Sequence, residues 1–374
     1  MKAGVVMRLR GLIRKESLQI LRDPSSIAIA FLLPAILLLL FGYGVSLDAR
    51  HIKLGIAVEQ PSAAASSFTT EFSNSVYFDP RVFSTADAAQ TALAQEKIDG
   101  FVWLQSDFAR RLAAGQDPSI GVYVNGVDAN NARIIENYVQ QSWAIWRSSQ
   151  LAASGAKDPI PIAIEPRIWF NPAVSSRDYL VPGLIAVIMT LTGALLTALV
   201  IAREWERGTM EALMVTRVTM LEILISKVLP YFFLGLGGMV VAVIIAVFLF
   251  HVPLHGSILV LTLSASLFML ASLGMGLLIS TIAKNQFVAG QIAIITTFLP
   301  AFILSGFIFD IGSMPWPIKV FTHIVAARYF VAILQSLFLA GTVWSVILPN
   351  FLALVVMAIV FLGAARLAAR KRLD

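Results

Sequence analysis

Residues of the types that perform chemistry are few in this chain and do not form a known catalytic motif. There is no cysteine, and the four histidines, at positions 51, 251, 255 and 323, lie outside any H-E-x-x-H pattern. His251 and His255 could bind zinc from one helix face, but Pro253 between them favours a turn. The G-x-S-x-G motif of serine hydrolases is also missing. We therefore expect neither an enzyme nor a metal site.

Nucleotide binding by this chain is not expected either. A Walker A motif needs a lysine followed by serine or threonine to hold the phosphates, and no lysine here has that neighbour. We therefore expect no cofactor on this chain.

Residues 203–227 form a charged segment, which carries four acidic and four basic side chains. Gly208 permits a sharp exit from a preceding helix, and Thr209 can cap a short helix after it. Thr219 and Glu222 then have the spacing of a capping box, which predicts the start of another helix. The short helix has one apolar face, which suits insertion into a cleft of a cytoplasmic partner. A simple solvated connection is the alternative.

A second cytoplasmic element is the amphipathic segment 5–22. Its apolar stripe comprises Val6, Leu9, Ile13 and Ile20, and its basic face comprises Arg8, Arg10, Arg14 and Lys15. This pattern predicts a helix along the inner leaflet, ending before Pro24 because a residue that precedes proline avoids helical geometry. Membrane anchoring explains such a helix by itself, and partner docking is the alternative.

These elements must be positioned by membrane helices, since five stretches contain no Asp, Glu, Lys or Arg. Composition agrees, with 58% hydrophobic residues, 13% charged residues and a mean hydropathy of +0.81. A span needs about 20 apolar residues. The uncharged stretches are 24–47, 179–202, 228–283, 285–309 and 329–365. The sequence therefore predicts a polytopic α-helical membrane protein, and its basic charge is not a sign of nucleic-acid binding.

Charge distribution predicts the orientation. Residues 1–23 hold six basic and two acidic side chains, whereas residues 48–178 hold 11 basic and 14 acidic, a net of −3. Both termini are expected in the cytoplasm, which requires an even number of spans, and six are counted.

The expected parts are a cytoplasmic interface helix (1–25), span one (26–46), an extracytoplasmic domain (47–178), span two (179–202), a cytoplasmic loop (203–223), spans three to five (224–307), an outer re-entrant segment (308–343), span six (344–366) and a cytoplasmic tail (367–374).

The extracytoplasmic domain is predicted to be α/β. Segments in which apolar and polar residues alternate, as in strands, are followed by segments in which apolar residues recur with the helical period. Residues 308–343 are apolar but interrupted by Pro315 and Pro317, which predicts a segment that enters the outer leaflet and returns. A pair of amphipathic helices on the outer surface is the alternative.

We expect no charged residue inside the six spans, which argues against a transporter driven by an ion gradient.

The fifth span holds the candidates for a transport pathway and its gate. Gln291 is a polar group in an apolar helix, and Ser305 lies where the helix is expected to break after the Pro300 kink. Phe298, Phe302 and Phe307 are candidate hydrophobic seals facing a second subunit. The alternative is that these phenylalanines face lipid.

Together these motifs resemble the ABC-2 type permeases, the membrane subunits of ATP-driven exporters of the type V class. The resemblance covers the whole chain. It is carried by Lys15-Glu16 with Leu21-Arg22-Asp23-Pro24, Arg203-Glu204 with Glu206-Arg207-Gly208-Thr209-Met210-Glu211, Leu304-Ser305-Gly306-Phe307, and Ala327-Arg328-Tyr329-Phe330. The run from Ile98 to Gly115 is similar to the subgroup with a large extracytoplasmic domain. Arg217 and Ala326 depart from the pattern, since many relatives have proline there.

The resemblance implies a bacterial inner-membrane permease for hydrophobic or amphipathic drug-like molecules. It implies two ATPase subunits, which bind ATP and Mg²⁺, and a second permease subunit, in a homodimer or a paralogous heterodimer. A periplasmic adaptor protein is a further candidate partner. The residues implied in coupling to the ATPase are Arg22, Asp23, Glu204, Glu206, Arg207, Gly208, Thr209 and Glu211. The alternative functions are an ion-driven secondary transporter and a component of a sodium efflux pump.

Overall fold

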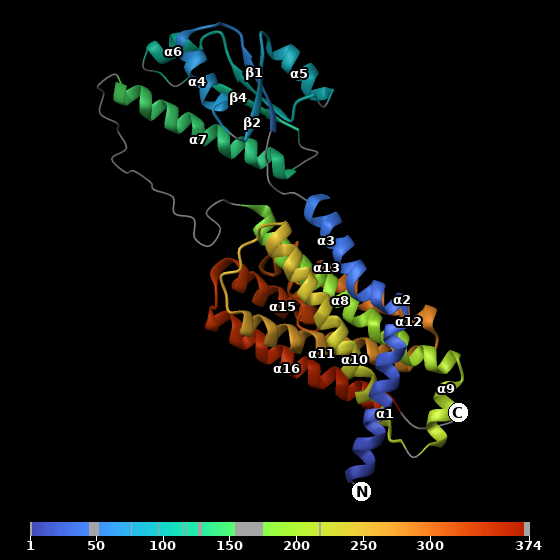
Figure 1. Cartoon of the computed structure of the whole chain (residues 1–374). Coiled ribbons are helices and arrows are strands. Elements are labelled where there is room, and N and C mark those ends of the chain that lie inside the picture. The colour runs from blue at the N-terminus through green and yellow to red at the C-terminus, as the bar shows by residue number, and fades with distance from the viewer. Residues whose placement is uncertain are drawn as a thin grey trace. The chain divides into compact units, whose positions relative to one another are not determined.

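The computed structural model describes residues 2–44, 52–75, 77–95, 97–114, 116, 118–125, 129–153, 175–216 and 218–369. The chain divides into two compact units, one formed by Met1–Ser46 with Ile168–Asp374 and the other by Leu47–Arg167. The first unit is a bundle of helices, and the second contains a β-sheet (Figure 1).

The helical unit contains six helical segments that are long and apolar enough to cross a membrane, within the described residues. The six segments are Pro24–Gly44, Ser176–Glu206, Met220–Leu249, Ile258–Ala283, Gln286–Leu304 and Trp344–Ala368. This agrees with the expectation of about six membrane helices, and the number becomes seven if the bent pair described below is itself one span.

The elements of this unit begin with α1 (Lys2–Leu21), α2 (Pro24–Ile27) and α3 (Leu33–Gly44). The next are α8 (Ser176–Glu206), α9 (Thr209–Val215), α10 (Met220–Ile244) and α11 (Ile258–Ala283). The last are α12 (Gln286–Ala293), α13 (Leu299–Leu304), α14 (Trp316–Thr322), α15 (Ala326–Gln335) and α16 (Trp344–Ala368). Four π-helical turns widen spans or the bent segment, at Ala28–Leu32, Ile245–Leu249, Ile294–Phe298 and Ser336–Ala340.

Helix α8 is the centre of the bundle and packs closely against α11, α12 and α15 (Figure 1). Small residues allow this approach, since a Cβ at Gly276 of α11 would lie 2.2 Å from the carbonyl oxygen of Ala194. Hydroxyl groups also join the two helices, because Thr197 Oγ1 donates to the Leu273 carbonyl at 2.8 Å. The backbone N–H groups of Ile201 and Ala202 lie 3.0 and 2.9 Å from Ser280 Oγ. Helix α8 is therefore joined to α11 by both close packing and hydrogen bonds.

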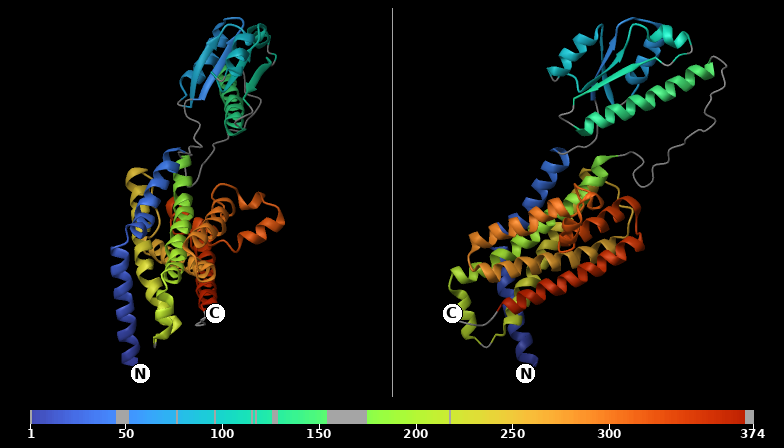
Figure 2. Two further views of the ribbon diagram at one scale, coloured as in Figure 1. Left: turned by 90° about the vertical axis from the view of Figure 1, so that its right-hand side faces the viewer. Right: turned by 180° about the vertical axis from the view of Figure 1, so that it is seen from behind.

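A bent helical pair precedes α16. Trp316–Thr322 and Ala326–Ala340 meet at an angle of 83°, which is the geometry of a broken span or of a re-entrant loop. Figure 2 shows this orange segment projecting to one side of the bundle.

The second unit is built on a four-stranded sheet of order β2-β1-β3-β4. Strand β1 (Ile52–Val58) is parallel to β2 (Phe78–Phe83) and β3 (Gly100–Leu104), and β4 (Ile120–Val124) is antiparallel to β3. In register, Leu54 pairs with Gly100, which in turn pairs with Val124. The strands lie in the segments where apolar and polar residues alternate along the sequence.

Helices cover both faces of this sheet. The helices are α4 (Ala63–Ser73), α5 (Ala86–Ala94), α6 (Phe108–Ala113) and α7 (Ala129–Ala153). Helices α4, α6 and α7 contribute to one apolar core and α5 to the other. Trp146 of α7 is buried against Phe68 of α4 and donates a hydrogen bond to Ser67 Oγ at 3.0 Å. This tryptophan is therefore part of the core of the unit.

Candidate functional site

Charged side chains from three helices meet in a buried cluster at one end of the helical unit. Lys227 Nζ of α10 donates to Glu16 Oε1 of α1 at 3.0 Å and to Glu204 Oε1 of α8 at 2.9 Å. These side chains are only 1%, 3% and 6% exposed, respectively. Lys15 Nζ, at the half-exposed edge, lies 3.2 Å from Glu16 Oε1 and 3.0 Å from Glu204 Oε1. Two carboxylates therefore face two ammonium groups, and the buried charges are balanced. We call these four residues the charge cluster.

The charge cluster extends to α9 through Thr209. Its hydroxyl donates to the Glu204 carboxylate and lies 3.2 Å from the Glu204 carbonyl oxygen. Gly208 before it has φ of 68°, the left-handed conformation that glycine adopts without strain, so α9 can turn away sharply from α8. The start of α9 is thus fixed to a carboxylate that α1 and α10 also hold.

The predicted capping box is present at the start of α10. Thr219 N donates to Glu222 Oε2 at 2.7 Å, and Glu222 N donates to Thr219 Oγ1 at 3.3 Å. Glu222 also accepts a hydrogen bond from Arg8 Nη2 at 2.9 Å, which adds a second tie between α1 and α10. The cap is therefore both a helix start and an anchor for the N-terminal helix.

A third tie joins the end of α1 to α8. Arg203 Nη1 lies 2.6 Å from Asp23 Oδ2, and Arg203 Nε donates to Gln286 Oε1 of α12 at 3.2 Å. Burial raises the pKa of Asp23, but hydrogen bonds from Ser25, Arg203 and Ser26 outweigh it and lower this pKa below its ordinary value. Asp23 is therefore ionised at neutral pH and holds the α1–α2 corner against α8.

Lys15 is held as a cation by its partners. Burial alone lowers the pKa of Lys15, but the carboxylates of Glu16 and Glu204 have the larger combined effect and raise it. An open polar cleft of about 740 Å³ begins beside Lys15. Its lining residues are Lys15, Leu18, Gln19, Arg22, Asp23, Ser25, Arg203, Arg207 and Gln286. Four basic groups and one acidic group give this cleft a positive charge.

The predicted coupling residues separate into a buried and an exposed group. Glu204 is inside the charge cluster and Asp23 is half-buried against Arg203. The exposed residues are Arg22, Glu206, Arg207, Gly208, Thr209 and Glu211. Glu206 also accepts a hydrogen bond from the backbone N–H of Gln286 at 2.8 Å. The structure thus brings these residues to one end of the unit, but Glu204 is covered by its own subunit.

The apolar face of α9 does not project outward. Met210 is 1% exposed and packs with Leu224 and Leu277, and Leu213 is partly buried beside them. The interpretation that the apolar face of this short helix inserts into a partner is therefore wrong for Met210 and Leu213, because the neighbouring ends of α10 and α11 already cover them. Val215, 84% exposed, is a large apolar side chain that α9 presents at its surface.

Two members of the charge cluster were missed in the sequence. The expectation that the spans contain no charged residue is wrong, because Lys227 lies about two turns inside the third span, Met220–Leu249. Its carboxylate partners offset the cost of burial, and an isolated lysine there would be unfavourable. Glu16 had a readable signal, since it falls on the apolar stripe of α1 between Ile13 and Ile20. A charge on an apolar helix face indicates a buried partner.

The gate candidates form an aromatic chain within one subunit. The ring centroids of Phe298 and Phe302 are 5.9 Å apart, those of Phe302 and Phe307 6.1 Å, and those of Phe302 and Phe41 of α3 6.3 Å. Phe307 is 4% exposed and packs on Gly183 of α8, where a Cβ would lie 2.4 Å from its ring. Ser305 is also buried, and Gln291 is exposed. Of the three phenylalanines, Phe298 and Phe302 therefore remain partly accessible.

The histidine pair lies outside any helix, in the connection before α11, as its proline suggested. His251 has φ of 57°, and His255 Nδ1 is 2.7 Å from the carbonyl oxygen of Phe338. Among the described residues, no group of three or more His, Cys, Asp or Glu side chains has the arrangement of a metal site.

The fold and the charge cluster define a polytopic membrane protein whose N-terminal helix is fixed to two of its spans. The chain belongs to the ABC-2 family of transporter proteins, whose sequence model matches residues 24–367. It is 45% identical to the probable multidrug ABC transporter permease YbhS of Escherichia coli strain K12, over 98% of both chains. It is 28% identical to the probable multidrug permease YbhR of that strain (91% of this chain, 94% of the relative) and 26% identical to its inner membrane transport permease YhhJ (89% and 91%).

Membership of this family makes the chain the membrane-spanning permease subunit of an ABC transporter and not its ATPase. It also implies an ABC ATPase as partner.

Proposed function

We propose that this permease exports uncharged hydrophobic or amphipathic drug-like molecules across a bacterial inner membrane, using ATP hydrolysed by a separate subunit. The multidrug names of two relatives support the substrate class, and the basic N-terminal segment supports a cytoplasmic location for both termini. Residues 47–178 would then be extracytoplasmic. We also propose a second permease subunit beside this one.

The charge cluster is the observation that carries the proposal. A movement of α9 acts on Glu204 through the Thr209 hydroxyl, and Glu204 is tied through Lys227 to α10 and through both lysines to α1. Because these ties are buried, displacement of α9 would move the ends of α8 and α10 together. Such a unit suits the transfer of force from a cytoplasmic ATPase to the spans.

The docking face for the ATPase would combine the exposed side of α9 with the polar cleft. Arg207 and Glu211 project from around α9, and Val215 adds an apolar contact at its end. The positive cleft beside Lys15 and Arg22 suits acidic side chains of the partner. ATP and Mg²⁺ would be bound by that partner.

Ion-gradient coupling fits the charge cluster less well. Lys227 is a buried ionisable group in a span, which is the usual feature of such transporters. However, two carboxylates neutralise it within hydrogen-bond distance, at the end of the helix and away from its middle. We therefore assign Lys227 a structural role, in which it holds α10 to α1 and α8.

The experiment is substrate-stimulated ATP hydrolysis by the purified complex of this permease with its ATPase subunit. We expect Glu211→Lys to reduce the stimulation severalfold, because it reverses an exposed charge on the proposed docking face. Glu136→Lys is the matched control, since Glu136 is an exposed helical glutamate of the α/β unit. Unchanged stimulation in the Glu211 variant would refute the docking assignment, provided that both variants assemble normally.

A further inference from the structure

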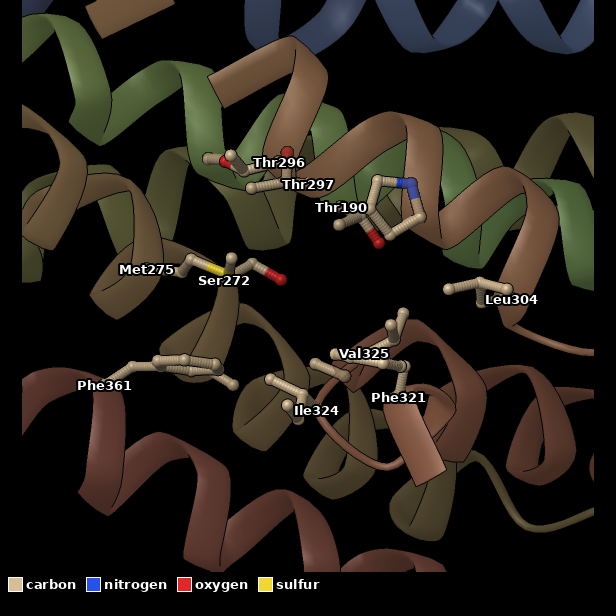
Figure 3. Close-up of a pocket in the computed structure, with 14 residues that line it drawn as sticks. Thr190, Ser272, Met275, Thr296, Thr297, Leu304, Phe321, Ile324, Val325 and Phe361 are labelled. Carbon is tan, nitrogen blue, oxygen red and sulfur yellow. The ribbon is translucent and has the colours of Figure 1, made fainter. Parts of the chain in front are cut away.

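A cavity of about 200 Å³ lies among the spans of one subunit, between α8, α11, α16 and the segment from Ile294 to Ala326 (Figure 3). Of the 14 residues that line it, none is charged and most are apolar. Phe321 and Ile324, which are 63% and 60% exposed, lie at its edge. The cavity therefore has apolar walls and an accessible side next to the bent helical pair.

The polar groups of the cavity are four hydroxyls, three of which already donate. Thr190 donates to the Ala186 carbonyl at 2.8 Å, Thr296 to Ile292 at 2.7 Å and Thr297 to Ala293 at 2.6 Å. Their hydrogens point to the helix backbone, so their oxygens can only accept a further hydrogen bond. These walls favour a ligand that donates.

Ser272 of α11 is different from the three threonines. It is 4% exposed, and its Oγ has no hydrogen-bond partner among the described residues. Figure 3 shows this hydroxyl turned toward the open centre of the cavity. Buried polar atoms are nearly always paired, so an unpaired hydroxyl that faces a cavity indicates the place of a missing partner.

The π-helical turn Ile294–Phe298 supplies part of the same wall. Thr296 and Thr297 belong to this turn, and Pro300 follows it on the cavity side. Single π turns within α-helices are often found at functional sites, because they re-aim the side chains of one turn.

We propose that this cavity binds a small uncharged apolar molecule of one or two rings that carries one hydroxyl, anchored by Ser272. The size follows from the volume, since an apolar cavity of about 150 Å³ in another protein holds benzene. The absence of charge follows because an ionised group would lack a partner there. The site goes beyond the proposed export function: it lies within one subunit and does not require the ATPase to dock.

The test is photolabelling of the full-length chain in lipid nanodiscs. The probe is a phenol with a trifluoromethyl-diazirine group, and the comparison probe is the same aryl diazirine without the hydroxyl. Labelled residues are identified by mass spectrometry. We expect the phenol to label cavity residues such as Met275 and Phe361 more than lipid-facing residues of other helices.

Two serine variants test the anchor. Ser272→Ala should lower phenol labelling of the cavity roughly two- to tenfold, the value of one hydrogen bond, and should not change labelling by the comparison probe. Ser264→Ala is the matched control, because Ser264 is an equally buried, unpaired hydroxyl of the same helix outside the cavity lining. Equal effects of the two variants, or an equal loss with both probes, would show that Ser272 is not an anchor.

A filling variant tests the location. Val325→Phe adds volume at the cavity wall and should remove labelling of Met275 by both probes. If labelling of Met275 persists in this variant, or if the phenol labels the cavity no more than lipid-facing positions, the proposed site is wrong. Lipid tails that fill the cavity would give this last result.

Discussion

Replacing Lys227 with methionine tests whether the charge cluster holds the helices together. The cluster contains two carboxylates and two lysines, so the variant leaves Glu16 and Glu204 with the half-exposed Lys15 as their shared cation. Methionine fills a similar volume, which limits cavity effects. The main change is therefore an uncompensated buried negative charge.

The expected loss of stability is large. Removing one partner of a buried ion pair costs about 3–5 kcal/mol, because the remaining charge stays desolvated. Lys227 and its two carboxylate partners, Glu16 and Glu204, are each 6% exposed or less, so solvent screening reduces this figure little. For a unit of this size the cost corresponds to a fall in Tm of roughly 6–20 °C.

The assay is thermal unfolding in detergent of the single variant and of a double variant with Glu204→Gln. The double variant restores the balance of charge, leaving Glu16 with Lys15. Its loss of unfolding free energy should therefore be smaller than the sum of the two single losses by about 1–3 kcal/mol. Arg8→Ala is a control, because it breaks a more exposed ion pair with Glu222 and should cost less than Lys227→Met. A stable Lys227→Met protein, or strictly additive effects, would refute the reasoning.

Three further outcomes are expected. Because the pKa of Asp23 is lowered in the folded protein, the stability advantage of wild type over Asp23→Asn should be constant from pH 7 to about 5 and shrink below that, as a thermal series at stepped pH would show. Ser66→Cys, an exposed position in a chain without native cysteine, should react with an impermeant maleimide outside the inner membrane; labelling only after lysis would reverse the topology. If α12–α13 faces a second subunit, cysteines at exposed Ile295 and Leu299 should crosslink between subunits, whereas buried Ala301 should not; equal crosslinking at all three would refute the gate.

The sequence determined the membrane character, the number of long helices and the family. In lipid, an uncharged run of 20 or more residues pairs its backbone N–H and C=O groups by forming a helix. Composition and length therefore suffice to count the helices. Local signals were equally reliable where they depend on neighbouring residues. The capping box of Thr219 and Glu222 and the turn at Gly208 are set by side-chain and backbone geometry within four residues.

Tertiary structure decided which side chains are available to act. Glu16, Glu204 and Lys227 are separated by up to 211 positions, and only the packing of α1, α8 and α10 brings them together in one cluster, whose charge Lys15 balances. The same packing covers Met210, which periodicity alone had placed on a free face, and buries Phe307 against α8. The Ser272 cavity likewise depends on residues from distant spans. Burial and pairing are properties of contacts between remote segments, and hydrophobic periodicity records only that a face is covered, not what covers it.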